Sequence, residues 1–253
     1  LRRLTCSLGT SVHGLPTSST GSHSVLLPPS HSTLSPTLRT CALACVLAMM
    51  TCGTVLAMDL TVGPQDGDVI GIDNNALQAA VDAVAREGGG TVYVKSGTYA
   101  MYNSLFLRSG VNVVGLGPAP VLQKVPSTRA ALATDGAYGQ DRVTVADASG
   151  LRKGMGIALS DDVHNSAWYV NVRTIVEVEG NTLVLDEALD LDFLVSRNGK
   201  VETCYPVICG KEMKRARVEN LVADGSRSTS AALNGCRGGA IYLWKTEGCV
   251  IDN

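Results

Sequence analysis

Residues 217–225 read RVENLVADG, and a related pattern returns as GAIYLW at 239–244 and as CVIDN at 249–253. Each segment is short, alternates apolar residues, and is bounded by Gly, Asp or Asn. Such repeats predict a solenoid, in which each coil buries its inward side chains against the neighbouring coils and Gly or Asn takes the left-handed corners. One coil cannot bury its own apolar face, so the pattern implies a stack of coils.

The preceding segments have the same character. TVYVK at 91–95, LFL at 105–107 and VNVV at 111–114 are each followed within three residues by a glycine. No helical pattern separates these short strands, which excludes alternating strand–helix units and leaves a sandwich, a barrel or a β-solenoid. The later repeats favour the solenoid.

Two segments depart from this pattern. Apolar residues between Ala76 and Ala85 follow helical spacing; Asp or Asn at 73–75 supplies the N-cap, and three glycines at 88–90 end the helix. Residues 175–185 read IVEVEGNTLVL, which predicts a hairpin with its turn at Gly180-Asn181. We interpret residues 142–195 as an antiparallel excursion from the solenoid.

The N-terminal part of the chain differs in composition from the rest. Residues 1–57 contain three arginines and no acidic residue. Residues 1–37, rich in Ser, Thr, Pro and His, predict a disordered leader or a mis-set start. Residues 38–57 combine one Arg, an apolar core and small residues before Met58, which is typical of a signal peptide cleaved after Ala57. The alternative is a membrane anchor. We favour the signal peptide because no basic stop-transfer flank follows, and we expect an extracellular or periplasmic protein without stable membrane insertion after cleavage.

Composition bounds the remaining choices. The chain has 253 residues, 45% of them hydrophobic, and a formal net charge of −2, which argues against nucleic acid as a partner. Four cysteines follow residue 58: Cys204, Cys209, Cys236 and Cys249. In an oxidising compartment they could form one or two disulfides or remain as thiols in the core. A zinc site is disfavoured because Cys236 and Cys249 form no second close pair.

Three motifs carry a family resemblance. DNNALQAAV at 73–81, GGTVYV at 89–94 and SGTY at 96–99 resemble the N-terminal signature of the pectate lyase superfamily, most narrowly its rhamnogalacturonase/epimerase-like members. The resemblance covers residues 60–253. It implies an all-β fold: a right-handed parallel β-helix with a short N-terminal capping helix, here with an antiparallel hairpin excursion. Because the chain stops within a repeat, we expect residues 58–253 to be a β-helix domain that lacks its C-terminal coils.

The resemblance implies polysaccharide chemistry without fixing the reaction, because the family includes hydrolases, lyases, epimerases and non-catalytic adhesive proteins. Elimination from a uronate needs a base and cations that neutralise the carboxylate; in β-helix lyases Arg or Lys and calcium have these roles. Lys211, Lys214, Arg215 and Arg217 are candidate cations here, with Lys211 and Arg215 as substrate-binding candidates. A solvated turn and strand edge is the simpler explanation of these residues. No cofactor is evident, and Ca²⁺ is expected only if the protein is a lyase.

Hydrolysis needs a pair of carboxylates instead. Asp161, Asp162 and His164 form the tightest titratable cluster, with Trp168 and Tyr169 as candidate sugar-stacking surfaces, although an exposed polar loop would have the same composition. Asp224 is a further catalytic candidate or a turn aspartate. The Asn-Thr-Asp, Asp-Asp, His-Gly and Arg-Ile-Lys pattern of polygalacturonases is absent from the sequence.

Together these features predict a secreted β-helix protein that binds acidic polysaccharide and cleaves it by lyase or glycosidase chemistry. The alternative is a non-catalytic β-helix that presents a binding or adhesive face. The sequence leaves the sugar, the linkage, an epimerase activity and the oligomeric state open.

Overall fold

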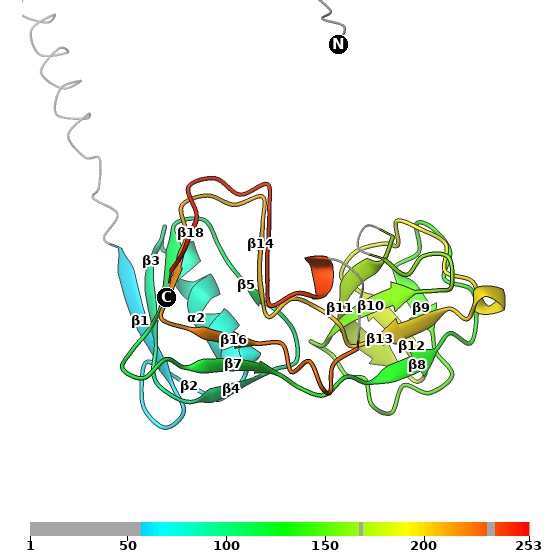
Figure 1. The fold of residues 1–253 in the computed structure, drawn as a ribbon, viewed down its shortest axis with the longest axis horizontal. Helices are drawn as coiled ribbons and strands as arrows, with labels where there is room; N and C mark the ends of the chain where they lie inside the picture. Colours follow the sequence, from blue (N-terminus) through cyan, green and yellow to red (C-terminus); the bar gives the residue numbers. More distant parts are fainter. Residues whose placement is uncertain (1–56, 167–168, 232–235, 253) are drawn as a thin grey trace, which may run out of the picture. The chain divides into compact units, whose positions relative to one another are not determined.

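Three parallel sheets dominate the computed structural model, which describes residues 57–166, 169–231 and 236–252 (Figure 1). The first has the order β18-β15-β6-β3-β1-β2, with strands Val250–Asp252, Arg217–Glu219, Val111–Gly115, Gly90–Val94, Met58–Gly63 and Val69–Ile70. The second has the order β16-β7-β4, with strands Val222–Asp224, Val121–Lys124 and Thr98–Met101. The third has the order β17-β14-β5, with strands Ile241–Trp244, Ile208–Lys211 and Leu105–Phe106.

The chain visits these sheets in rotation. From β3 in the first sheet it passes through β4 in the second and β5 in the third, returns to β6 and continues to β7. The rotation resumes at β14 in the third sheet and continues through β15, β16, β17 and β18. We call the three sheets together the parallel stack.

Side chains in the parallel stack form columns across neighbouring strands. Leu60, Val92, Val113, Val218 and Ile251 are successive register partners in the first sheet. Val92 and Val113 are fully buried in an apolar core that also contains residues of the other two sheets. The repeated apolar alternation therefore fills one continuous core, as the sequence predicts.

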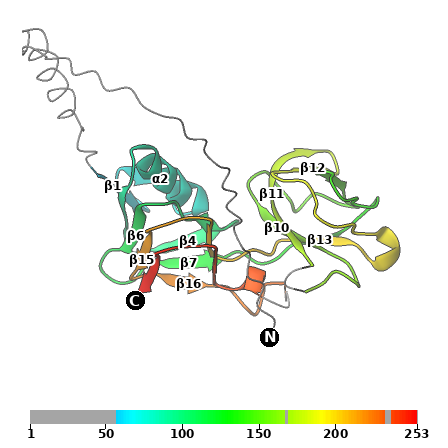
Figure 2. The ribbon, with the colours of Figure 1, turned by 90° about the horizontal axis from the view of Figure 1, so that it is seen from above.

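Helix α2 (Asn74–Arg86) packs its apolar face on the same core, and Figure 2 shows it near β1, at the opposite end of the first sheet from β18. The Asp73 carboxylate caps the helix by accepting hydrogen bonds from the backbone N–H groups of Asn75 and Ala76, at 3.0 and 3.2 Å. Gly90 follows with a φ of +148°, where an added Cβ would lie 1.9 Å from the Met58 carbonyl oxygen. The helix, its cap and its glycine stop confirm the sequence prediction.

A six-stranded antiparallel sheet interrupts the parallel stack between β7 and β14 (green to yellow in Figure 1). Its order is β8-β13-β10-β11-β12-β9, with strands Arg129–Ala131, Lys200–Glu202, Gly156–Ser160, Asn171–Glu179, Thr182–Leu185 and Arg142–Thr144. A 3₁₀ turn, η1 (Val195–Arg197), precedes β13. The edge strands β8 and β9 meet through an antiparallel bridge between Leu132 and Val145, so the sheet closes on itself and encloses its own core. We call residues 129–202 the inserted sheet.

The antiparallel excursion is longer in the structure than the sequence predicts. The β11–β12 hairpin around Gly180-Asn181 is confirmed, but the excursion begins at Arg129 and ends at Glu202, whereas the prediction placed it at 142–195. Strands β8 and β13 have three residues each, too few to show a period in the sequence. Their pairing is long-range, and it turns the predicted hairpin excursion into a sheet with a separate core.

The cysteines are thiols where the structure describes their side chains. Cys204, Cys209 and Cys249 are free, with Cys204 and Cys209 buried. These three cysteines therefore form no disulfide with one another, and the buried Cys204 and Cys209 match the alternative of thiols in the core. The Cys236 side chain is outside the described part of the structure.

Other predictions fall on residues that the structure does not describe: the leader at 1–37, nearly all of the signal peptide at 38–57, and Trp168. Among the described residues, no helix combines the length and the hydropathy that crossing a membrane requires.

Lys124, at the end of β7, is a buried cation whose replacement should stabilise the protein. Lys124 is only 3% exposed, and its Nζ lies 4.8 Å from the centroid of the Tyr205 ring. No ion-pair partner occurs within the described ranges, and burial lowers the pKa of Lys124. We expect Lys124→Met to raise the free energy of unfolding at neutral pH by about 1–2 kcal/mol, because methionine keeps the contact with the ring and removes the desolvated charge.

The stability gained by Lys124→Met should depend on pH. A lysine whose pKa is lower in the folded state binds more protons when unfolded, so the wild-type protein gains stability as pH rises from neutrality. The advantage of Lys124→Met should therefore shrink in alkaline buffer. Urea unfolding at neutral and alkaline pH measures this, with the exposed Lys153→Met as control. A Lys124→Met variant less stable than the wild type at neutral pH would contradict it.

Candidate functional site

A pocket of about 380 Å³, which we call the cleft, lies over the outward face of the third parallel sheet. Phe106, Cys209 and Tyr242 are register partners on β5, β14 and β17, and all three line the cleft. Lys211 lies two residues beyond Cys209 on the same strand and lines it as well. The alternate residues Leu105 and Ile208 belong to the core, so strand alternation places the cleft side chains on the opposite face.

The inserted sheet supplies the facing wall. Val172, Arg173 and Thr174 of β11 line the cleft together with Asp186 and Glu187, which follow β12. The wall is tied to the parallel stack by the Asn103 side chain, whose Nδ2 donates to Oγ1 of Thr174 at 3.1 Å. The cleft therefore exists only where two separately cored parts of the fold meet.

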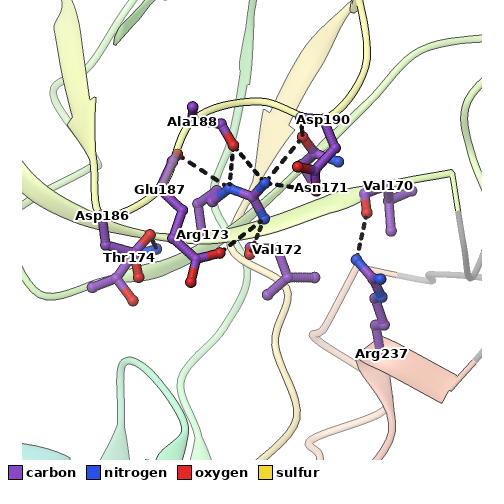
Figure 3. Close-up of polar contacts among 10 residues, drawn as sticks. All are labelled: Val170, Asn171, Val172, Arg173, Thr174, Asp186, Glu187, Ala188, Asp190 and Arg237. Atoms are coloured by element: carbon purple, nitrogen blue, oxygen red, sulfur yellow. Dashed lines mark hydrogen bonds and ion pairs between the residues drawn. The ribbon is translucent and has the colours of Figure 1, made fainter. Parts of the chain in front are cut away.

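Arg173 organises the wall through backbone contacts (Figure 3). Its side chain is 4% exposed, and Nε donates to the carbonyl oxygens of Glu187 and Ala188, each at 3.2 Å. Nη2 also donates to the Ala188 carbonyl at 2.6 Å, and Nη1 to the Val172 carbonyl at 3.0 Å. These bonds fix the chain after β12 against β11.

The remaining partners of Arg173 are side chains. Nη2 donates to Oδ2 of Asp190 at 2.9 Å and to Oδ1 of Asn171 at 3.4 Å, while Nη1 lies 3.8 Å from Oε2 of Glu187 (Figure 3). A buried guanidinium is tolerated because its donors are used in this way. Arg173 therefore has little hydrogen-bonding capacity left for a ligand and acts as a structural clamp.

Basic side chains outnumber acidic ones around the cleft. Arg108, Arg173, Lys211 and Arg237 line it, against Asp186 and Glu187. Arg108 pairs with Asp82 at 2.8 Å, and Arg237, in the turn η2 (Cys236–Gly238), donates from Nη1 to the Val170 carbonyl at 3.0 Å (Figure 3).

The acidic residues and Lys211 differ in their contacts. Lys211 is exposed and has no ion-pair partner within the described ranges. The Asp186 carboxylate accepts from the Thr174 N–H at 2.8 Å, whereas the Glu187 side chain is 68% exposed. The cleft thus combines four basic side chains with two exposed carboxylates, of which Asp186 already accepts a backbone hydrogen bond.

The predicted Asp161 cluster lies elsewhere, on the inserted sheet. The Asp161 side chain is 0% exposed, and its carboxylate accepts from the N–H groups of Val163, His164 and Leu194, at 2.9, 2.6 and 3.3 Å. Nε of Arg197 lies 2.9 Å away as an ion-pair partner, without hydrogen-bond geometry. Burial raises the pKa of Asp161, but the three N–H donors and Arg197 lower it by more. The pKa of Asp161 is therefore below the ordinary value of an aspartate. This carboxylate joins two loops of the inserted sheet.

His164 and its neighbours surround that buried carboxylate. Nδ1 of His164 is 3.1 Å from the Asp192 carbonyl oxygen and 3.7 Å from Oδ1 of Asp161. Its ring packs with Tyr169, whose centroid is 6.3 Å away, while Asp162 is exposed. None of these residues lines the cleft.

The other candidates are dispersed. Asp224 on β16 accepts from Gln123 and from the Ser226 N–H, at 2.9 and 2.8 Å, and the Ser226 bond lowers its pKa. Arg215 is exposed outside the cleft, in a left-handed turn with φ of 54°. Of the predicted site residues, the cleft contains Lys211 and Cys209.

Two further predicted cations are paired. Lys214 lies 2.7 Å from Glu247, and Arg217 lies 2.6 Å from Glu219 and 3.2 Å from Asp252. Across the described ranges, no group of three or more His, Cys, Asp or Glu side chains is placed to hold a metal ion.

Sequence reasoning missed Arg108, Arg173, Asp186, Glu187 and Arg237. Arg173 could have been identified from the sequence. In NVRTIV at 171–176 buried and less buried positions alternate, and Asn171, Arg173 and Ile175 are on the buried side. A charged residue at an inward strand position needs hydrogen-bond or ion-pair partners, which makes it a candidate for a structural or functional role. The other four residues show no local pattern.

Comparisons with known proteins give limited similarity, and no protein-family model matches the chain. "Alginate lyase 7" of Azotobacter vinelandii is 40% identical over 60 residues, which cover 21% of this chain and 7% of that protein. The alignment thus spans a small fraction of the curated relative.

Solved structures are similar at low TM-scores. The Gp54 tailspike of Acinetobacter baumannii bacteriophage AP22, in complex with A. baumannii capsular saccharide, has 16% identity, a TM-score of 0.30, and coverage of 69% of this chain and 33% of that chain. The tailspike gp61 of Pseudomonas phage phi297 has 16% identity, a TM-score of 0.31, and coverage of 58% and 30%. A structure described as a glycoside hydrolase has 12% identity, a TM-score of 0.27, and coverage of 65% and 50%. We assign neither fold nor function from these scores.

Proposed function

We propose that the protein binds a uronate-containing polysaccharide in the cleft and cleaves it. The observation that carries this proposal is a pocket lined by aromatic and apolar residues together with three basic side chains besides the clamp Arg173, namely Arg108, Lys211 and Arg237. Cationic side chains pair with the carboxylates of uronate units, and aromatic rings stack on sugar faces. The segment similar to an alginate lyase supports the same substrate class.

We also propose that the parallel stack is a right-handed parallel β-helix of the pectate-lyase type. The rotation of the chain through three parallel sheets, the in-register columns and the helix at one end support this. Export by the signal peptide at 38–57 is part of the proposal and rests on the sequence pattern alone. N-terminal sequencing of protein from the culture medium tests it, with Met58 as the expected first residue.

Calcium has no obvious place in the cleft. The carboxylates that line it are Asp186 and Glu187, and Asp186 already accepts the Thr174 N–H. Calcium sites use six to eight oxygen ligands. We therefore assign neutralisation of the uronate carboxylate to the basic side chains, first to Lys211, which is exposed and has no ion-pair partner within the described ranges.

Lys211→Ala tests the binding site. We expect this variant to bind polygalacturonate or alginate about tenfold more weakly than the wild type, because one charge-assisted contact is lost. Isothermal titration calorimetry at two salt concentrations measures the effect, and the difference should shrink as salt screens the charge.

The control is Lys153→Ala, which removes an exposed lysine that does not line the cleft. A neutral dextran should bind neither variant. Equal affinity of Lys211→Ala and wild type for the uronate polymers would exclude the cleft as the binding site. Binding without cleavage would favour the alternative, a non-catalytic polysaccharide-binding protein.

A further inference from the structure

We infer that Glu187 is the catalytic base of an elimination reaction in the cleft and that Arg173 is its positioning residue. This inference rests on the proposed function. It differs from the β-helix lyases that the sequence resembles, in which Arg or Lys and calcium have the roles of base and cation.

The two acidic residues of the cleft are not equivalent. Asp186 is used within the wall: its carboxylate accepts the Thr174 N–H at 2.8 Å, and its own N–H donates to the Thr174 carbonyl at 3.0 Å. The Glu187 side chain is 68% exposed, and Arg173 is its one ion-pair partner within the described ranges, at 3.8 Å. Both residues are exposed, but Asp186 already accepts a backbone hydrogen bond, so Glu187 is the carboxylate with more freedom to approach a bound sugar.

Arg173 fixes the backbone from which the Glu187 side chain extends. Its guanidinium holds the carbonyl oxygens of Glu187 and Ala188 and the carboxylate of Asp190, two residues on (Figure 3). These contacts hold the backbone that follows the Glu187 Cα, and the Asp186 N–H, which donates to the Thr174 carbonyl at 3.0 Å, holds the backbone before it. Together they limit where the Glu187 carboxylate can move. A group that takes a proton from carbon must be held in this way, since small displacements are costly.

The different contacts of the two carboxylates favour elimination over hydrolysis. Hydrolysis uses two carboxylates with separate roles. The two exposed carboxylates of the cleft belong to adjacent residues, and Asp186 already accepts the Thr174 N–H, which leaves Glu187 to act beside the exposed Lys211. One base and one cation are the set that elimination requires. Lys211 neutralises the uronate carboxylate and so makes the proton at C5 acidic enough to leave.

The reaction balances without a co-reactant. The Glu187 carboxylate accepts the C5 proton, the C5–H electron pair forms the C4=C5 double bond, and the bond from C4 to the glycosidic oxygen breaks. That oxygen takes a proton from a water molecule, and the resulting hydroxide takes the proton from Glu187. No water is consumed, and each cleavage leaves one unsaturated uronate end.

The test compares full-length wild type, Glu187→Gln and Arg173→Lys on polygalacturonate and alginate, by the ultraviolet absorbance of unsaturated ends and by calorimetric binding. We expect Glu187→Gln to bind normally and to lose about a thousandfold in kcat, because it removes a general base. Arg173→Lys should lose about 10- to 100-fold in kcat with KM within about twofold, because the base is retained but displaced.

Two controls separate catalysis from folding. Glu177→Gln alters an exposed carboxylate of β11 that does not line the cleft, and it should match the wild type. Asp190→Asn keeps Arg173 but weakens its clamp, and should lower kcat severalfold even if Arg173→Lys does not fold.

The outcomes distinguish this inference from the proposed function. Saturated products, or Glu187→Gln with wild-type kcat, would overturn the inference and leave polysaccharide cleavage intact. Binding without cleavage by the wild type would also overturn it. Failure of the wild type to bind any uronate polymer would overturn both. An Asp190→Asn variant with unchanged kcat, or with its loss entirely in KM, would overturn the positioning role.

Discussion

Asp161→Ala is expected to lower the free energy of unfolding by about 3–5 kcal/mol, because the variant leaves buried donors without an acceptor. Three backbone N–H groups point at this carboxylate, and among the described residues the buried Nε of Arg197 has no hydrogen-bond partner besides its ion-pair contact with Asp161. Urea unfolding monitored by circular dichroism measures the loss. The inserted sheet should respond first, since both loops that Asp161 joins belong to it.

The pH dependence follows from the same contacts. The pKa of Asp161 is lowered in the folded protein, so its contribution is complete above the pKa of an unfolded aspartate, about 3.9, and is lost as pH falls through the lower folded value. Asp161→Asn should therefore flatten the stability profile in acid. The exposed neighbour provides a control, because Asp162→Ala should cost less than about 1 kcal/mol. A stable Asp161→Ala variant that loses cleavage would support a catalytic Asp161 instead.

Asp161 also shows why the residues predicted from the sequence and the cleft lie in different places. Asp161, Asp162 and His164 are close in sequence, and closeness in sequence favours a local turn as much as a catalytic centre. Here the Asp161 carboxylate accepts the N–H groups two and three residues ahead, which is the contact that aspartates make in turns. The titratable residues do lie close together, and the contacts of Asp161 stabilise the loop that contains them.

The cleft could not be found by such local patterns. Its lining residues run from Asn103 to Tyr242 and become neighbours only when β5, β14 and β17 align and the inserted sheet folds against them. Helix α2 and the β11–β12 hairpin were predictable because their signals lie within about 13 residues. Closure of the inserted sheet depends on β8 meeting β9, and such long-range pairings leave no period in the sequence.

Tyr205 occupies the point where the chain returns from the inserted sheet to the parallel stack. It is 1% exposed, and its hydroxyl donates to the Met101 carbonyl at 2.7 Å. Its ring lies so close to Gly156 of the inserted sheet that a Cβ there would be 2.7 Å from Cδ1. The next residue, Pro206, lines the cleft and accepts a hydrogen bond from the Ser104 hydroxyl at 2.6 Å. Packing at Tyr205 therefore supports both the junction and the cleft.

Tyr205→Ala is expected to lower the free energy of unfolding by about 3–5 kcal/mol and to weaken polysaccharide binding, because the cavity removes support beneath Pro206. Tyr205→Phe is the matched control: it keeps the ring beside Lys124 and Gly156 and loses one hydrogen bond, at a cost of about 1 kcal/mol. Thermal unfolding and calorimetric binding of the two variants measure both effects. If Tyr205→Ala lost stability but bound polysaccharide as tightly as Tyr205→Phe, the cleft would not depend on this junction. Loss of affinity in Tyr205→Ala alone would show that packing of the inserted sheet on the parallel stack forms the binding site.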